Sequence, residues 1–240
     1  MLCVMSAEMQ KMKRTFSLKL LWIAPLVPLF CAYGGGQLSG FYFWYVAFLP
    51  GALTIICSMI MLKDSKMKYR GILSLPVNKG ALWIGKVMAS SLMLFFSCAV
   101  FLFLTIIFGL IPPYTGIGHI PTITVFAASS LLFITFLWQI PFCLFLSAKF
   151  GIFFTIITNM LFNIIGGAAF ADGAMWIFPF AISVRLMSPV LQILPNGLPA
   201  KRGSLLLNSS VILPGILVSL ALFVVILMLT TAWFCRQEAK

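Results

Sequence analysis

One stretch of the sequence has the residue types and spacing of a phosphate-binding loop. The residues GALWIGK, from Gly80 to Lys86, fit the pattern G-x-x-x-x-G-K, in which backbone N–H groups and a lysine hold nucleotide phosphates. The next residue is Val87, where such a loop needs a Ser or Thr hydroxyl for Mg²⁺, and no strand-like run precedes Gly80. A long apolar segment follows instead, so Gly and Lys here are better explained as the cytoplasmic boundary of a membrane span. We therefore expect no ATP hydrolysis and no cofactor in this chain.

The remaining side chains that could do chemistry are scattered. The single histidine, His119, stands in the loop-like stretch GIGHIP. The acids fall in four separate segments, so no two of them are expected to work as a general acid–base pair: they are Glu8, Asp64, Asp172 and Glu238. Four of the six cysteines lie in apolar runs and no two form C-x-x-C, so we expect them to pack as small hydrophobic residues. The sequence thus predicts no catalytic residue and no metal site, and the chain is not expected to be an enzyme.

Uncharged polar side chains do occur inside the apolar runs. Gln139 lies beside Pro141, and Asn159 and Asn163 are four residues apart, which puts the two asparagines on one face of a helix. Such groups either form hydrogen bonds between packed spans or line a path for a polar substrate. No ionisable residue falls inside an expected span, which argues against a proton-coupled carrier.

The composition is that of a membrane protein. Of the 240 residues 62% are hydrophobic and 8% are charged, against roughly a quarter charged in soluble domains. There are 16 Lys and Arg but only 4 Asp and Glu, a formal net charge of +12. The basic residues cluster in short segments between apolar runs, a pattern that sets membrane topology and meets anionic lipid head groups. We expect contact with the lipid bilayer and none with nucleic acid.

Six apolar runs come near the roughly 20 residues that a helix needs to cross the bilayer core. They cover about 20–33, 43–62, 87–110, 121–147, 150–171 and 211–234. The glycine-rich stretch 34–40 and the Pro- and Gly-rich stretch 111–121 predict turns, and Pro141 should bend the fourth span. The fold class predicted is an all-α integral membrane protein with six transmembrane helices in a single domain over residues 1–240.

The segment 172–210 is predicted to be extracellular and partly re-entrant. It contains two apolar pieces, 174–184 and 187–198, each too short to span and each interrupted by proline. Pieces of this length are better explained as re-entrant or interfacial helices.

The basic residues also predict the orientation. With the N-terminus inside, 13 of the 16 Lys and Arg residues fall in cytoplasmic segments, which leaves Arg185, Lys201 and Arg202 outside. Both termini are then cytoplasmic. The basic stretch 6–20 has apolar residues at spacings of three and four, so it is either an interfacial helix on the inner leaflet or a plain charged flank. The N-terminal stretch 1–16 shows no apolar core with a small-residue cleavage site, so we expect no removable signal peptide.

The cytoplasmic loop 63–86, between the second and third spans, carries a short amphipathic pattern. At helical spacing Tyr69, Ile72 and Leu73 share one face, which Pro76 would end. Such a helix either rests on the lipid surface or docks into a cytoplasmic partner. The candidate docking residues are Tyr69, Arg70, Ile72, Leu73, Leu75 and Pro76.

Several segments taken together carry a family resemblance. They are KRTFSLKL with WIAP near the N-terminus, FWYVAFLPG at the second span, KMKYRGILSLPVNKGALWIGK in the loop, FLWQIPFCLFLSAKFG at the fourth and fifth spans, and ILPNGLPA before the sixth. The chain resembles the permease subunits of lantibiotic-immunity ABC transporters, the MutE/EpiE and MutG families of the ABC-2 class. The resemblance covers nearly the whole chain, and it does not decide between the E-type and the G-type subunit.

The resemblance implies a heteromeric pump in a bacterial plasma membrane. ATP and Mg²⁺ would be bound by a separate ATP-binding cassette subunit, present in two copies, beneath this chain and a related sister permease. The pump would expel a lantibiotic or other cationic antimicrobial peptide and so give self-protection or resistance. The ABC-2 fold implies an interfacial N-terminal helix at 6–19, a coupling helix at 69–76 and re-entrant helices within 174–198. The alternative is a non-transport membrane protein, such as a sensor accessory.

Overall fold

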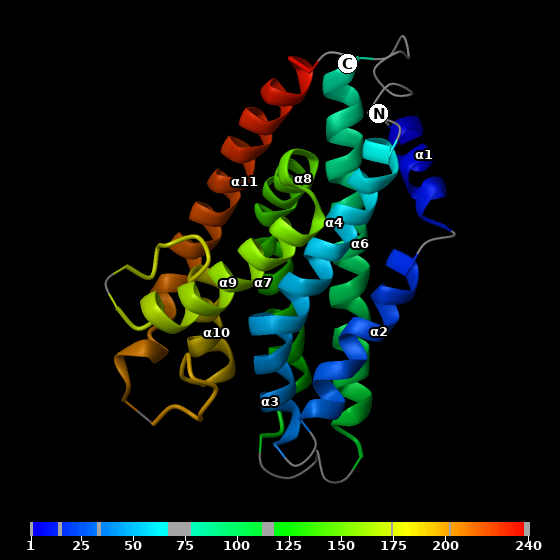
Figure 1. The fold of residues 1–240 in the computed structure, drawn as a ribbon. Helices are drawn as coiled ribbons and strands as arrows, with labels where there is room; N and C mark the ends of the chain where they lie inside the picture. Colours follow the sequence, from blue (N-terminus) through cyan, green and yellow to red (C-terminus); the bar gives the residue numbers. More distant parts are fainter. Residues whose placement is uncertain are drawn as a thin grey trace.

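The computed structural model describes residues 2–13, 16–32, 35–66, 78–111, 118–173, 175–201 and 203–237, apart from the side chains of residues 2, 3 and 63–66. Most of these residues are helical (Figure 1). The α-helices are α1 (Leu2–Met12), α2 (Phe16–Cys31), α3 (Gly36–Phe43), α4 (Leu49–Lys66), α6 (Lys79–Phe108), α7 (Thr122–Phe136), α8 (Gln139–Phe150), α9 (Ile152–Phe170), α10 (Ile182–Leu191) and α11 (Ile212–Cys235). A π-helical turn, η1 (Trp44–Phe48), joins α3 to α4, and two 3₁₀ turns, η2 (Leu205–Leu207) and η3 (Ser209–Val211), precede α11.

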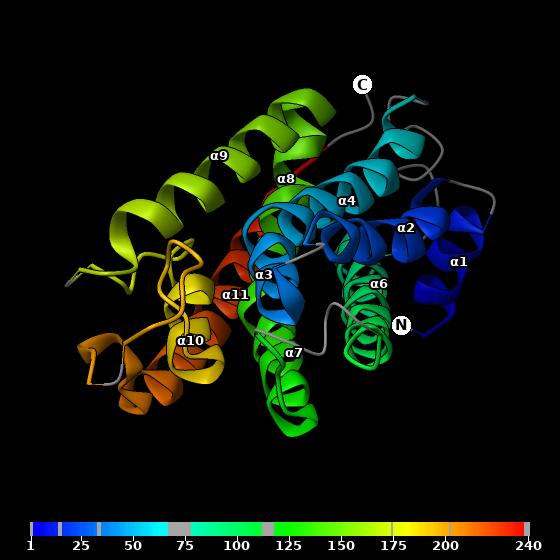
Figure 2. The same ribbon diagram turned by 90° about the horizontal axis from the view of Figure 1, so that it is seen from below.

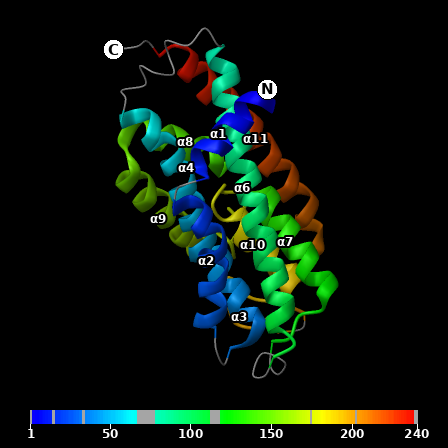
Figure 3. The same ribbon diagram turned by 90° about the vertical axis from the view of Figure 1, so that its right-hand side faces the viewer.

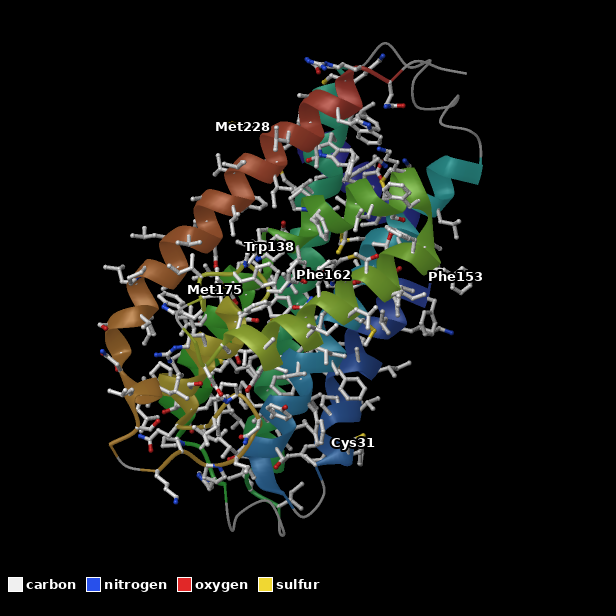
Figure 4. All side chains as sticks on the ribbon, turned by 60° about the vertical axis from the view of Figure 1, so that its left-hand side comes forward. Cys31, Trp138, Phe153, Phe162, Met175 and Met228 are labelled. Atoms are coloured by element: carbon white, nitrogen blue, oxygen red, sulfur yellow. The ribbon has the colours of Figure 1, made fainter. Side chains whose placement is uncertain are left out.

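Four helices are long and apolar enough to cross a membrane: Gly36–Leu62, Lys79–Phe108, Ile152–Phe170 and Ser209–Cys235. Two bent pairs raise the number to six if each pair is one span. The bend is 75° between Val4–Met12 and Phe16–Cys31, and 42° between Thr122–Phe136 and Gln139–Phe150. By length and composition, these helices are compatible with a multi-pass membrane protein. Large apolar side chains face outward, as Phe153 on α9 and Met228 on α11 do in Figure 4.

The helix after the glycine-rich stretch begins earlier than expected. The sequence predicts a turn over 34–40, but α3 starts at Gly36, which has a φ of +72° that favours glycine. The second membrane helix therefore runs from Gly36 rather than from residue 43. This helix contains a π-helical turn just before Pro50. Proline has no N–H to donate, and its ring displaces the carbonyl of Val46, four residues earlier. The N–H of Leu49 therefore donates to the carbonyl of Trp44, five residues back.

The third membrane helix also begins before the predicted position. The side chain of Asn78 accepts a hydrogen bond from the Gly80 N–H at 2.8 Å, an N-cap that starts α6 at Lys79. Residues 79–86, assigned above to the loop, are therefore the first two turns of α6. With 30 residues α6 is about 45 Å long, so it extends past a hydrocarbon core of about 30 Å.

The fourth predicted span is bent, as Pro141 predicts. The break lies at Leu137 and Trp138 between α7 and α8, because Pro141 cannot donate to the Leu137 carbonyl and its ring would clash there. The segment 172–210 differs from the expectation of two pieces, since α10 runs straight across the predicted gap at Arg185. Arg185 lies within α10, and its guanidinium donates a hydrogen bond to the carbonyl of Leu206 at 2.6 Å.

The helices pack around α4 and α6. On one side α4 contacts α8 and α9, while α6 contacts α1, α2, α7 and α11. Seen from below, α9 runs along one side of the bundle, and α10 lies between α9 on one side and α7 and α11 on the other (Figure 2). An aromatic cluster forms around Phe180, just before α10. The buried ring of Trp138 and the partly exposed ring of Phe162, both labelled in Figure 4, pack on the Phe180 ring at 4.8 and 5.3 Å between ring centroids.

Candidate functional site

The three polar side chains predicted inside the spans lie together in the structure. The side chains of Gln139 on α8 and Asn163 on α9 bond reciprocally: Gln139 Nε2 donates to Asn163 Oδ1 at 3.0 Å, and Asn163 Nδ2 donates to Gln139 Oε1 at 3.2 Å. Asn159, one turn earlier on α9, donates through Nδ2 to Thr54 Oγ1 at 2.9 Å. All of these side chains are buried. The network therefore joins three membrane helices, α4, α8 and α9.

The Pro50 carbonyl is a further acceptor at the level of the network. The Pro50 carbonyl follows the π-helical turn and accepts bonds from Thr54 Oγ1 at 2.7 Å and from Asn159 Nδ2 at 3.4 Å. Asn159 Oδ1 is buried and finds no hydrogen-bond partner among the described residues. The arrangement suits interhelical packing in this conformation, and it leaves one acceptor open for a polar group.

Removing one amide of the reciprocal pair should weaken the bundle. We expect Asn163→Leu to lower the free energy of unfolding by roughly 1 kcal/mol, because the Gln139 amide then stays buried without its partner. The double change Gln139→Leu with Asn163→Leu should cost less than the sum of the two single changes. Melting in detergent measures this, with Thr158→Leu, at a partly exposed position on the same helix, as the control for added apolar volume. Additive single effects would contradict direct pairing.

A second polar site was missed by the sequence reasoning. Lys86 is fully buried inside α6, and its Nζ lies 3.2 Å from Glu8 Oε1 on α1. Glu8 also accepts from Lys11 Nζ at 2.7 Å, on the solvent side of the pair. The statement that no ionisable residue enters a span needs correction, since Lys86 belongs to a membrane helix rather than to the loop before it. The partners are far apart in the sequence, and no local pattern signals the pairing.

The first turns of α6 are also tied to the end of α11. Trp83 Nε1 donates to Thr230 Oγ1 at 3.0 Å, and Lys79 Nζ donates to the carbonyl of Gln237 at 2.6 Å. The Trp83 ring packs on Phe234 at 4.9 Å between centroids. The segment GALWIGK is therefore a helix that packs on α1 and α11.

At the opposite end of the bundle, α3 and the end of α10 border a cavity of about 630 Å³ whose walls carry few side-chain charges. Its polar wall residues include Ser39, His119, Thr124 and Gln192. Arg185 is buried nearby in α10; burial lowers the pKa of its guanidinium from the ordinary value, while the negative charge of Asp172 raises it. Arginine is protonated in proteins, so this end holds a buried positive charge.

The candidate docking residues of the loop fall outside the described part of the chain. These are Tyr69, Arg70, Ile72, Leu73, Leu75 and Pro76. The described helices that flank them, the end of α4 and the start of α6, lie at the same end of the bundle as α1 and the C-terminal end of α11 (Figure 1). Among the described residues, no three His, Cys, Asp or Glu side chains gather as metal ligands.

Comparison with known proteins adds no relative. The chain matches no protein-family model, no curated protein and no solved structure.

Proposed function

We propose that this chain is the membrane-spanning permease subunit of an ABC transporter that expels lantibiotics or related cationic antimicrobial peptides from a bacterial plasma membrane. The observation that carries the proposal is the set of family-like segments around the loop and the spans, FWYVAFLPG and KMKYRGILSLPVNKGALWIGK among them. The helical arrangement is compatible with the ABC-2 class. A short helix α1 precedes a 75° bend at the N-terminal end, and α10 packs back into the bundle before α11.

The proposal assigns the energy source to other chains. ATP and Mg²⁺ would be bound by a partner subunit, in two copies, with a sister permease completing the membrane part. The segment GALWIGK supports this division, because Gly80 to Lys86 form a helix and Lys86 is buried against Glu8 rather than set in a loop that could hold phosphate. The loop between α4 and α6 would dock the ATPase on the cytoplasmic side, with both termini on that side.

The cargo path is proposed to suit an apolar and cationic peptide. The outward surfaces of α9 and α11 are apolar and rich in Phe, Leu, Ile and Val. The buried network of Gln139, Asn159 and Asn163 is neutral, so a passing peptide would meet no fixed charge from it. These side chains would hold the helices together in the described conformation and turn toward the cargo when α9 moves.

Expression in a sensitive Gram-positive host tests the function. Co-expression of the chain with its cognate ATPase and sister permease should raise tolerance to a lantibiotic, and less peptide should remain cell-associated. The chain expressed alone should give no tolerance, because it has no means to use ATP. An ATPase subunit with its phosphate-binding lysine replaced should abolish the effect.

Two results would point elsewhere. Protection that persists with the inactive ATPase would mean that the chain sequesters peptide or alters the envelope. Absence of protection, with no ATPase recovered on purification of the chain, would favour the non-transport accessory or sensor.

A further inference from the structure

The N-terminal helix α1 sits directly on the first turns of α6 (Figure 3). The closest approach is at Gly85, where a Cβ atom would lie 2.6 Å from Cγ1 of Val4, so only glycine admits α1 at this distance. The next residue, Lys86, faces Glu8 one turn further along α1. Gly85, which allows the close contact, and Lys86, which forms the ion pair, are thus neighbours on α6. Both belong to the segment whose sequence resembles a phosphate-binding loop.

The pairing is buried rather than superficial. The Lys86 side chain is fully buried and that of Glu8 is 4% exposed, whereas Lys11 on the outer side is 38% exposed. Removing one partner of a buried ion pair leaves a charge without compensation, which is strongly unfavourable, while replacing both partners by apolar side chains is often tolerated. The Glu8 carboxylate therefore determines where α1 can rest on α6.

The same turns of α6 contact α11 on their other side through Lys79 and Trp83. They also follow the connection 67–77 directly. The start of α6 therefore holds α1 on one side and α11 on the other, directly after this connection in the sequence.

We propose that Glu8 and Lys86 are positioning residues that fasten α1 to the start of α6, so that a movement of the cytoplasmic loop carries α1 with it. The role of this movement in transport rests on the proposed function, since the moving loop would be the one docked on the ATPase. The fastening itself depends only on contacts within this chain.

The position of α1 is read from the reactivity of one cysteine. In a cysteine-free background, Met12→Cys places a thiol at a site that is 1% exposed when α1 is docked. The rate at which this thiol reacts with a soluble maleimide is measured on the assembled complex in membranes. The tolerance of the host is measured in parallel, with the lantibiotic against which the wild type protects best. We expect Glu8→Gln to raise the rate on the order of tenfold and to bring tolerance down to that of the empty vector, because the carboxylate 3.2 Å from the Lys86 ammonium is then gone.

Three further variants separate pairing from loss of fold. The exchanged pair Glu8→Lys with Lys86→Glu, made together with Lys11→Gln so that the new lysine does not face Lys11, should restore slow labelling and tolerance. The apolar pair Glu8→Leu with Lys86→Met should do the same. Lys11→Gln is the matched control, because it changes the more exposed of the two lysines that contact Glu8 and leaves the buried pair in place, and it should behave as the wild type.

The outcomes divide the two proposals. Slow labelling in Glu8→Gln would overturn the fastening role. Fast labelling with full tolerance would show that α1 need not be held for transport, and it would overturn the functional consequence. If the wild-type complex protects against no lantibiotic, the proposed function is wrong. The labelling rates would still decide whether the ion pair fixes α1.

Discussion

Replacing Gly109 by alanine is expected to destabilise the bundle by roughly 2–4 kcal/mol, the cost of breaking the buried hydrogen bonds of one neighbouring amide. Gly109 caps α6, and a Cβ atom there would overlap Nε2 of Gln37 and lie 2.8 Å from its Cδ. Gln37 is buried, and two hydrogen bonds hold its amide in this position. Its Nε2 donates to the Thr105 carbonyl at 2.7 Å, and its Oε1 accepts from the Ile120 N–H at 2.8 Å. Alanine must displace both bonds together.

Two comparisons make the effect of Gly109→Ala specific. Gly51→Ala is the matched control, since its Cβ meets only Met160 at 3.7 Å; it should be neutral or stabilising by up to about 1 kcal/mol through helix propensity. In a Gln37→Ala background the space at Gly109 is open, so adding Gly109→Ala should cost little more. The fraction of protein that survives heating in detergent measures each variant. A full additional cost in the Gln37→Ala background would contradict the steric explanation.

The helices themselves could largely be predicted from the sequence. Long apolar runs need internally bonded backbone in a membrane, so 152–170 and 212–235 lie within one or two residues of the expected spans. Local chemistry also explains the bend before Pro141. The glycine-rich stretch at 34–40 misled the prediction because one glycine with positive φ is enough for the turn, and the helix can begin at once at Gly36.

Long-range pairing is the part that could not be predicted. The i, i+4 spacing places Asn159 and Asn163 on one face, and that face meets Gln139. Nothing local indicates that Thr54 and the Pro50 carbonyl complete the network, since both depend on how α4 crosses α9. The same holds for Lys86, whose partner lies on a helix that the sequence places on the membrane surface. A motif resembling a nucleotide site is in this case explained by helix packing.

Introducing a charge into the cytoplasmic loop should separate the chain from its proposed ATPase partner. We expect Leu73→Asp to abolish recovery of the ATPase with the purified chain, although the chain still inserts in the membrane. Tyr69, Ile72 and Leu73 share one face at helical spacing, and these residues lie outside the part of the chain that the structure describes. If this face is buried against the ATPase, an aspartate there must lose its hydration. A hot-spot loss of about 2–4 kcal/mol weakens binding by roughly 30- to 1,000-fold, enough to lose the complex on a column.

Ser74→Asp adds the same charge at the neighbouring position and is the control. It lies roughly 100° around the helix from Leu73, away from the apolar face, so the ATPase should still be recovered. We expect both variants to be present in the membrane fraction in equal amounts and to melt at the same temperature in detergent. The altered residues lie between the end of α4 at Lys66 and the start of α6 at Lys79, outside both helices. Recovery of the ATPase with Leu73→Asp would mean that the face rests on lipid, because an aspartate can turn toward water at a membrane surface but cannot do so within a closed protein interface.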